Sequence, residues 1–355
     1  MLSNLCAMLD VIKILSPFVA SFVVGVLFTP LLTHYLYKYK VWKKTGGKIA
    51  LNGKEAVEFN KLHAEKEEKT PRMGGIVVWF SVLFVSLSFW VLAKSFDDLH
   101  VIDFISRSQT WILLFALVLG AVVGFLSDLL DIGYEKRELK IFWRLALVAS
   151  FSLFLAYWFY AKLGVSQISI PFGGYLELGV LFIPFVVALG LFLYASGVID
   201  GIDGLSGGVF LFIFLAYSAI AMIQGQLDIA AFAASVAGAL SAFLWFNIPP
   251  ARFYMTETGT MALTMTLLAL TFMTDKLADG KGLAVLPVVA FLLFATVFSN
   301  IIQVASKKIF GKKIFKIAPV HHHFEALGWP SYKVTMRYWV LGIIFALSGV
   351  LLSLI

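Results

Sequence analysis

Three adjacent histidines, His321, His322 and His323, are the residues of this sequence with the clearest capacity for chemistry. The chain has only six histidines, so three in a row are difficult to explain by packing alone. They follow a stretch with five lysines between positions 307 and 316, and they precede the last hydrophobic segment. Imidazole and ammonium groups at a membrane surface can hold an anionic substrate. The pattern therefore indicates a phosphate-handling site on a membrane enzyme.

Carboxylates at the ends of hydrophobic segments form a second group of candidates. Carboxylates at membrane depth are costly and are usually kept for a function or a partner. Asp128 and Asp131 lie three residues apart, so on a helix they share one face. They could hold a cation or lie beside a reacting phosphate. Alternatively, they pair with Lys136 or Arg137 at the end of the helix.

A glycine-rich segment, 196–208, carries Asp200 and Asp203 between two apolar stretches. Its five glycines let the backbone approach a ligand and adopt positive φ angles. Aspartates in such a loop suit Mg²⁺, a hydroxyl group or the edge of a base. A flexible turn with an aspartate helix cap is the alternative, but a plain turn does not need so many glycines.

Two further segments carry polar residues next to apolar runs. Glu257 comes directly before an apolar segment, where it could ligate a metal or cap a helix. Tyr254 could stack on a nucleobase or pack against lipid. Lys66, Lys69 and Arg72 could contact phosphate, and an ordinary helix start with interfacial cations explains them equally well.

The elements that must position these residues are predicted to be membrane helices. The chain is 60% hydrophobic and only 14% charged, which excludes an ordinary soluble protein of this length. Apolar runs of about 18 or more residues predict ten spans. They are approximately 12–36, 72–93, 110–130, 141–161, 179–196, 206–224, 227–246, 258–274, 282–305 and 335–354. We expect an all-α polytopic membrane protein with one domain, 1–355, and no internal repeat.

The distribution of Lys and Arg predicts the orientation. The connectors after every odd-numbered span hold 22 of the 28 basic residues, and the other side holds six. These connectors are approximately 37–72, 131–144, 197–205, 247–257 and 306–337. The positive-inside rule places them in the cytoplasm and both termini outside. All candidate residues then lie on the cytoplasmic face, which could grip lipid headgroups or nucleotide phosphates, although topology alone also explains most of these lysines.

The single cysteine, Cys6, excludes an intramolecular disulfide and a cysteine-based metal site. The first apolar run follows Lys13 and shows no small-residue cleavage pattern, so we expect it to form the first helix and not a cleaved signal.

With these segments in view, the chain resembles the phospho-N-acetylmuramoyl-pentapeptide transferases (MraY), a family of the polyprenyl-phosphate hexosamine-1-phosphate transferase superfamily. The resemblance covers most of the chain, and its most specific part is the block 318–330 with the three histidines. Further similar segments are Gln303, 311–315, 245–247, 200–205 and 70–75.

The resemblance implies a reaction and its partners. Members of the family transfer phospho-MurNAc-pentapeptide from UDP-MurNAc-pentapeptide to undecaprenyl phosphate, release UMP and need Mg²⁺. We therefore expect Mg²⁺ as the cofactor and these two substrates in a bacterial inner membrane, with the active site facing the cytoplasm. No nucleic-acid partner is expected, and a homodimer is one oligomeric state to consider.

The resemblance also implies roles for single residues. Asp128 matches the second aspartate of a pair on the third helix and is the first choice for orienting or activating the lipid phosphate, with Asp131 one turn further on. Asp200 and Asp203 match the aspartates of the glycine-rich loop, the second of which contacts uracil. Tyr254 falls where the family has an aromatic residue that stacks on uracil.

Metal and substrate contacts are implied in the same way. Glu257 falls at the position of a magnesium-binding aspartate. The three histidines lie near substrate phosphate and uridine, and His322 joins the aspartates in the expected catalytic set. Other expected substrate contacts are Lys66 or Lys69, Thr70, Asn247 and Gln303.

Three departures from the family pattern bear on activity. Ser127 replaces the first aspartate of the pair, Gly197 replaces an asparagine before the glycine-rich loop, and Glu257 replaces an aspartate. Two alternatives therefore stay open. One is a related transferase with another UDP-sugar, which the histidine block disfavours. The other is a transporter or a degenerate relative that only binds lipid phosphate, which the retained set of polar residues disfavours.

Overall fold

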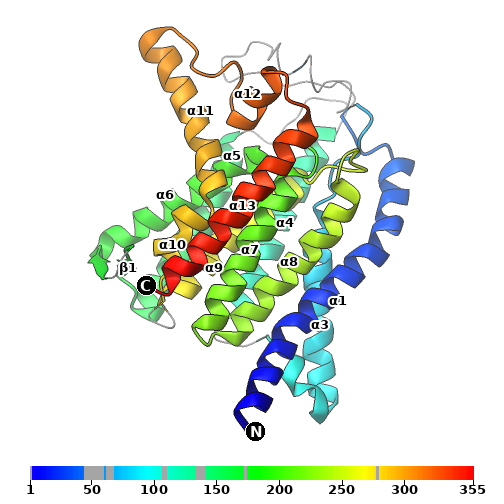
Figure 1. The fold of residues 1–355 in the computed structure, drawn as a ribbon, viewed down its shortest axis with the longest axis vertical. Helices are drawn as coiled ribbons and strands as arrows, with labels where there is room; N and C mark the ends of the chain where they lie inside the picture. Colours follow the sequence, from blue (N-terminus) through cyan, green and yellow to red (C-terminus); the bar gives the residue numbers. More distant parts are fainter. Residues whose placement is uncertain are drawn as a thin grey trace.

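Long helices dominate the computed structural model, which describes residues 2–43, 60, 68–105, 110–132, 141–171, 174–276 and 280–355. The long helices are α1 (Leu2–Lys38), α3 (Ile76–Ser95), α4 (Thr110–Ile132), α5 (Ile141–Tyr157), α6 (Phe182–Ala195), α7 (Leu205–Ile223), α8 (Leu227–Asn247), α9 (Thr256–Lys276), α11 (Phe291–Phe310) and α13 (Ser331–Ser353). The short elements are η1 (Asp97–Ile102), η2 (Trp158–Lys162), β1 (Gln167–Ser169), β2 (Tyr175–Glu177), η3 (Gly179–Leu181), η4 (Ser196–Ile199), α10 (Gly282–Val289) and α12 (Val320–Ala326). Figure 1 shows α12 at the opposite end of the bundle from the N-terminus.

The expected spans correspond closely to the helices. Over the described residues, nine helices are long and apolar enough to cross a membrane. The most hydrophobic part of α8 is 83% buried inside the bundle, whereas that of α1 is only 22% buried. Helix α8 is therefore a core helix, while most of α1 is left to face lipid. The protein is a polytopic helical membrane protein, as the composition predicts.

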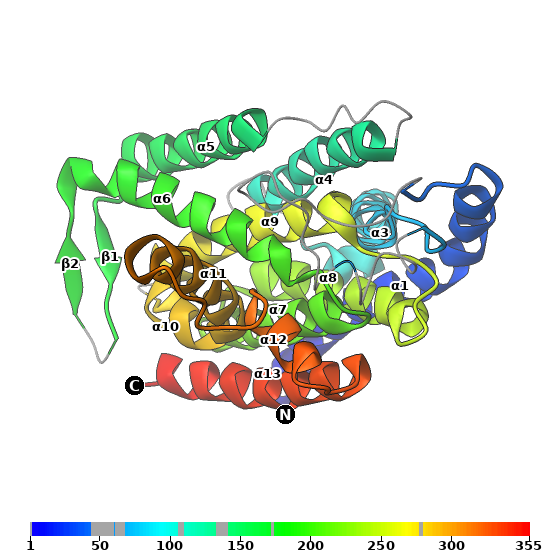
Figure 2. The same ribbon diagram turned by 90° about the horizontal axis from the view of Figure 1, so that it is seen from above.

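Helix α9 corresponds to the expected span 258–274, and it differs from the helices of the other nine spans. Its seven threonines lower its hydropathy, so it does not count among the apolar helices of the described chain. Figure 2 shows it in the middle of the bundle, and nearly all of its side chains are buried. The hydroxyl groups of Thr264 and Thr271 donate to the carbonyl oxygens of Thr260 and Leu267, at 2.8 Å each. Bonds of this kind satisfy the hydroxyls within the helix, so α9 can lie in the core.

The expected single span over 282–305 is wrong, because the chain breaks there into two helices. Helix α10 ends at Val289 and α11 begins at Phe291. Pro287 lies inside α10, and proline removes one helical hydrogen bond and clashes with the preceding turn. Beyond the break, α11 runs away from the bundle in Figure 1.

The expectation of an all-α fold is also wrong in one place. Strands β1 and β2 pair as an antiparallel hairpin. The carboxylate of Asp275, at the end of α9, accepts hydrogen bonds from the backbone nitrogens of Ser169 (3.3 Å) and Leu283 (2.9 Å) and from the Ser169 hydroxyl. This buried carboxylate fastens the hairpin to α9 and to the first turn of α10, which stabilises an isolated pair of short strands.

Glycines allow α9 to lie very close to α4 and to the start of α3. A Cβ atom on Gly124 would lie 2.1 Å from the carbonyl oxygen of Glu257, and one on Gly75 would lie 2.3 Å from the nitrogen of Gly259. Small residues at helix contacts let backbones approach in membrane proteins. This contact brings the C-terminal end of α4 against the N-terminal end of α9, where most of the candidate carboxylates meet.

Candidate active site

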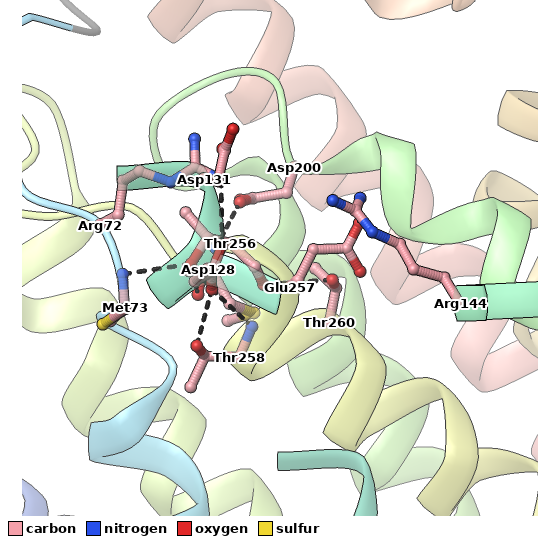
Figure 3. Close-up of polar contacts among 11 residues, drawn as sticks. Arg72, Met73, Asp128, Asp131, Arg144, Asp200, Thr256, Glu257, Thr258 and Thr260 are labelled. Carbon is pink, nitrogen blue, oxygen red and sulfur yellow. Dashed lines mark hydrogen bonds and ion pairs between the residues drawn. The ribbon is translucent and has the colours of Figure 1, made fainter. Parts of the chain in front are cut away.

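Asp128 lies at the centre of the polar cluster in Figure 3, fully buried at the end of α4. Its Oδ2 accepts hydrogen bonds from the Thr256 hydroxyl (2.5 Å), the Thr258 backbone nitrogen (2.8 Å) and the Thr258 hydroxyl (2.6 Å). The first N–H groups of a helix lack partners within the helix, and a carboxylate there also interacts favourably with the helix dipole. Asp128 thus caps α9 from a neighbouring helix.

Arg72 joins the two aspartates of α4. Its Nη2 lies 3.0 Å from Oδ1 of Asp128 and 2.9 Å from Oδ2 of Asp131. The shared face expected from the three-residue spacing is therefore confirmed, with a guanidinium group as the shared cation. The alternative partners, Lys136 and Arg137, lie outside the described residues. The Asp131 side chain is 12% exposed whereas that of Asp128 is not exposed at all, so Asp131 is the more accessible carboxylate.

Thr256 connects three segments through an unusual backbone conformation. Its φ is +56° and that of Met73 is +66°, a region that residues other than glycine rarely adopt, β-branched ones such as threonine least of all. The Thr256 nitrogen donates to Oδ2 of Asp200 (2.8 Å), and the Met73 nitrogen donates to the Thr256 hydroxyl oxygen (3.1 Å). Such conformations cost about 1–3 kcal/mol each and gather at functional sites. Here the conformation joins Asp128, Asp200 and the entry to α3.

The glycine-rich loop lies beside this cluster, as expected. Oδ1 of Asp200 accepts a hydrogen bond from the Ser206 hydroxyl at 2.6 Å, and Oδ2 of Asp203 accepts one from the Ala251 nitrogen at 3.3 Å. Both aspartates are partly exposed, so each can still meet a ligand. The loop therefore brings Asp200 to the start of α9 and Asp203 to the segment 248–255.

Asn247 was expected to contact substrate, but its side chain binds backbone instead. It is buried, its Oδ1 accepts a hydrogen bond from the Gly204 nitrogen (2.9 Å), and its Nδ2 donates to the Phe253 carbonyl oxygen (2.7 Å). Both ends of the amide therefore bind backbone. This geometry makes Asn247 a positioning residue that joins the glycine-rich loop to the segment carrying Tyr254.

The histidine triplet meets the glycine-rich loop at Gly201. A Cβ atom there would lie 2.5 Å from Nε2 of His322 and 3.0 Å from Nε2 of His321, so both rings pack directly against the loop. Nδ1 of His322 lies 2.7 Å from Oε2 of Glu325, which fixes the orientation of the ring. His323 is more exposed, and its Nδ1 accepts a hydrogen bond from the Lys316 nitrogen at 3.1 Å.

The other expected substrate contacts lie around the rim. Gln303 is buried beneath the segment 311–316, and its Oε1 accepts hydrogen bonds from the Ile314 and Phe315 nitrogens at 3.1 and 3.0 Å. Lys69 is exposed and Thr70 partly exposed at the entry to α3. Lys66 lies outside the described residues. Tyr254 is half-buried, and its backbone nitrogen donates to the Pro71 carbonyl oxygen at 2.9 Å.

Glu257 lies in the first turn of α9 and faces Arg144 of α5 (Figure 3). Their contact, Oε1 to Nη1, is 3.3 Å long, and the two side chains are 26% and 15% exposed. Within the described part of the chain, no group of three or more His, Cys, Asp or Glu side chains could hold a metal ion. Mg²⁺ in transferase sites usually takes one or two carboxylates together with substrate phosphates. An accessible carboxylate at the edge of an acidic cluster fits that chemistry.

Known proteins similar over the full length decide the family. The phospho-N-acetylmuramoyl-pentapeptide-transferase of Geobacillus sp. (strain WCH70) is 31% identical over 97% of this chain and 98% of its own. The chain belongs to the phospho-N-acetylmuramoyl-pentapeptide-transferase family. A relative of the same name from Latilactobacillus sakei subsp. sakei (strain 23K) is 35% identical over 94% of this chain and 96% of its own. The family model described as glycosyl transferase family 4 matches residues 110–275.

Membership of the phospho-N-acetylmuramoyl-pentapeptide-transferase family confirms the resemblance that the motifs predict. The matched region, 110–275, includes both aspartates of α4, the glycine-rich loop and the start of α9. The histidine triplet lies beyond this region and is covered by the near full-length similarity to the relatives. The protein is thus a multi-pass membrane protein of a family found in bacteria.

Three residues of the cluster, Arg144, Thr256 and Thr258, were not singled out by the sequence. Arg144 counts there only as a basic residue of a connector, and Thr258 as part of a helix. The available signal for Arg144 was its place at the start of an apolar helix, because cations at membrane depth need a partner or a function. For Thr258 the sequence carries no signal, because its contact with Asp128 joins residues 130 positions apart.

Restoring the family's aspartate pair should damage this protein. Ser127 is buried, and within the described structure its hydroxyl has no hydrogen-bond partner. Ser127→Asp would place a second carboxylate beside Asp128 without a cation of its own, since Arg72 already contacts two. We expect a loss of about 2–4 kcal/mol of stability, measured as a lower melting temperature in detergent, with lower activity.

Ser127→Ala is the matched control for this prediction. Removing a buried hydroxyl without a partner should be neutral or slightly stabilising. Equal stability in Ser127→Asp and Ser127→Ala, together with higher activity in the aspartate variant, would contradict this prediction. It would show that the serine lowers activity and that a second carboxylate is tolerated beside Asp128.

Proposed function

We propose that this protein transfers phospho-MurNAc-pentapeptide from UDP-MurNAc-pentapeptide to undecaprenyl phosphate in a bacterial inner membrane. The near full-length similarity to phospho-N-acetylmuramoyl-pentapeptide-transferases carries the proposal. The geometry supports it, because Asp128, Asp131, Asp200 and Glu257 converge on the N-terminal end of α9. Two arginines lie among them, which gives the site charges of both signs.

The proposed reaction needs positioning and charge neutralisation more than covalent chemistry. An oxygen of the lipid phosphate attacks the β-phosphorus of the sugar nucleotide, and UMP leaves. Phosphoryl transfer is catalysed mainly by aligning the groups and stabilising the developing negative charge. The side chains of Arg72 and Arg144 are 16% and 15% exposed, so both can present positive charge to a phosphate while a carboxylate holds them in place.

Asp128 and Asp131 take different parts in this proposal. Asp128 is buried and fully hydrogen-bonded, so its first effect is to hold Arg72 and the start of α9 in position. Asp131 is partly exposed on the same helix face and is the carboxylate that can meet the lipid phosphate. Asp200 links the glycine-rich loop to Thr256, and His322 adjoins that loop at Gly201.

We propose Mg²⁺ as the cofactor, with Glu257 as its protein ligand. Bound there, Mg²⁺ would neutralise charge on the diphosphate of the donor. Glu257 can serve because its side chain is accessible and its contact with Arg144 is long. Arg144 would hold the carboxylate in place by pairing with one of its oxygens.

Asp203 and Tyr254 are proposed to hold the uracil, the first by a hydrogen bond and the second by stacking. Loss of a buried hydrogen-bond partner costs about 1–3 kcal/mol. Asp203→Ala should therefore weaken donor binding about tenfold or more and leave the affinity for undecaprenyl phosphate nearly unchanged, as isothermal titration can measure. Equal weakening for both substrates would indicate a disturbed fold instead.

The proposed orientation has the site in the cytoplasm and both termini outside. In a Cys6→Ser background, Lys313→Cys should react with a membrane-impermeant thiol reagent only from the cytoplasmic side of sealed vesicles. Lys162→Cys, at the other end of the bundle, should react only from outside. Both side chains are exposed, so each is accessible to the reagent. The reverse pattern would overturn the topology. A homodimer can be tested on the purified protein in detergent by light scattering.

The proposed function is tested by UMP release from purified protein with undecaprenyl phosphate and a panel of UDP-sugars, with and without Mg²⁺. We expect release only with UDP-MurNAc-pentapeptide and only with Mg²⁺. Release with another UDP-sugar would indicate a related transferase.

One observation favours the remaining alternative, a non-catalytic relative that binds lipid phosphate: Asp128 is already saturated with hydrogen bonds. Binding of both substrates without UMP release would establish that alternative.

A further inference from the structure

A recess of about 560 Å³ lies where the C-terminal end of α1 meets the segment that follows α8. It is lined by Pro30, Thr33, His34, Tyr37, Lys38 and Arg252. Three of the six lining residues are basic and none is acidic. The Tyr37 hydroxyl donates to the Arg252 carbonyl oxygen at 3.1 Å, which ties the two walls together.

The positive charge of this recess comes from Lys38 and Arg252. Within the described part of the chain, Lys38 and Arg252 form no ion pair, and their recorded contacts are with aromatic rings. The Lys38 Nζ lies 5.8 Å from the centre of the Tyr39 ring, and the Arg252 guanidinium carbon lies 5.5 Å from that of Phe246. Other cations of the described structure, such as Lys94 and Arg337, also lie against aromatic rings, so the recess is distinguished by the convergence of three basic residues with no acidic residue in its lining. Unpaired cations around one recess favour an anionic ligand.

The position of the recess relative to α1 indicates what kind of anion it meets. Helix α1 leaves large apolar side chains exposed, with Leu27 73% and Leu31 55% exposed, so this face contacts lipid tails. The recess lies in the last turns of α1, which ends at Lys38. Basic residues at the end of a span lie at the depth of lipid headgroups. A ligand with a phosphate in the recess can therefore lay its acyl chains along Leu27 and Leu31.

We propose that this recess binds the phosphate of an anionic phospholipid, with Lys38 and Arg252 as its main contacts. Arg252 belongs to the segment 248–255, which also carries Tyr254 of the proposed nucleotide site. The recess itself contains none of the carboxylates or histidines of the candidate active site. It is thus a separate lipid site that adjoins the active site through one loop, and its occupancy does not depend on the proposed reaction.

Binding of single lipids to the full-length protein tests the proposal. The purified protein in detergent is titrated with phosphatidylglycerol or phosphatidylcholine, and native mass spectrometry measures the dissociation constant of the first bound lipid. A basic side chain near a membrane surface changes binding of an anionic lipid about fivefold. We expect the double variant Lys38→Gln, Arg252→Gln to bind phosphatidylglycerol about 30-fold more weakly, with a much smaller loss for phosphatidylcholine, whose choline cation offsets the charge of its phosphate.

A matched control removes the same charge elsewhere. Lys94→Gln, Lys162→Gln changes two exposed lysines at the opposite end of the bundle from the recess and should alter phosphatidylglycerol binding less than twofold. The charge-retaining variant Lys38→Arg, Arg252→Lys should bind like the wild type, which keeps the test valid if the neutral variant does not fold. Equal losses in the Lys94→Gln, Lys162→Gln control, or equal wild-type affinity for the two lipids, would overturn the site.

Competitors distinguish the source of the phosphate. Inorganic phosphate and glycerol 3-phosphate at millimolar concentration should not displace phosphatidylglycerol from the wild type, because they lack acyl chains. Displacement by either would assign the recess to a soluble anion and reject the lipid proposal. Displacement by undecaprenyl phosphate at an equal concentration, lost in the Lys38→Gln, Arg252→Gln variant, would assign the recess to the acceptor substrate and equally reject it.

Discussion

Asp128→Asn should reduce transfer by about a hundredfold or more and should also lower the stability of the protein. An asparagine oxygen can still accept the hydrogen bonds from Thr256 and Thr258. Its amide nitrogen must then face Nη2 of Arg72, which places one donor against another. Breaking a buried ion pair by changing one partner costs about 3–5 kcal/mol, and the remaining contact between Arg72 and Asp131 should reduce this to the lower end. Steady-state kinetics and thermal unfolding in detergent measure the two effects.

The Asp131→Asn variant distinguishes a catalytic role of the α4 aspartates from a structural one. This side chain is 12% exposed whereas that of Asp128 is not exposed at all, so the loss of Asp131 should lower stability less than the loss of Asp128. If Asp131 meets the lipid phosphate, kcat should fall strongly while donor affinity stays nearly intact, as expected for an interaction made in the transition state. If the two aspartates share the role, each single variant should keep appreciable activity and only the double variant should be inactive. Normal kcat in Asp128→Asn and in the double variant would remove the catalytic centre from this end of α4.

Glu257→Gln should lower kcat by about a hundredfold or more, or should steeply raise the Mg²⁺ concentration needed for turnover. The substitution keeps the shape of the side chain and an oxygen for Arg144, but it removes the negative charge that would hold a cation. Binding of UDP-MurNAc-pentapeptide by the variant should no longer strengthen on addition of Mg²⁺, which isothermal titration measures without any turnover.

Two further variants sharpen the Glu257 prediction. Glu177→Gln, on the exposed strand β2, removes the same charge away from the polar cluster and should leave both readouts unchanged. Glu257→Asp tests the extra methylene group, and a large loss of activity would show that the start of α9 has adapted to the longer side chain. A wild-type Mg²⁺ dependence in Glu257→Gln would remove Glu257 from the metal site.

Most of the fold could be predicted because membrane-spanning helices are specified by local runs of apolar residues. Runs of apolar residues specify nine of the helices without reference to any distant contact. Helix α9 was also located correctly, yet its threonines set it apart from the lipid-facing helices. The break between α10 and α11 was missed because the apolar run continues through Pro287. The hairpin was missed because its two three-residue strands depend on Asp275, which lies more than 100 positions from Ser169.

The location of the site could be predicted from the sequence, but the contacts and roles of its residues could be predicted less well. The distribution of charge placed the carboxylates and histidines on one face, and the contact of Gly201 with His321 and His322 confirms that two of these segments meet. The roles within the site depend on contacts between distant residues. Nothing in the local sequence shows that Asp128 would be saturated by Thr256 and Thr258. The positive φ of Thr256 is likewise imposed by its neighbours in space and has no signature in its residue type.

The most direct test of the account is to measure both products of one reaction. Purified protein is incubated with UDP-MurNAc-pentapeptide, undecaprenyl phosphate and Mg²⁺, and UMP and the lipid-linked product are quantified together by mass spectrometry. We expect equal amounts of UMP and undecaprenyl-diphospho-MurNAc-pentapeptide from the wild type, neither product without Mg²⁺, and at least about a hundredfold less of both from Glu257→Gln at the Mg²⁺ concentration that suffices for the wild type. Binding of both substrates by a folded wild-type protein that forms neither product would contradict it.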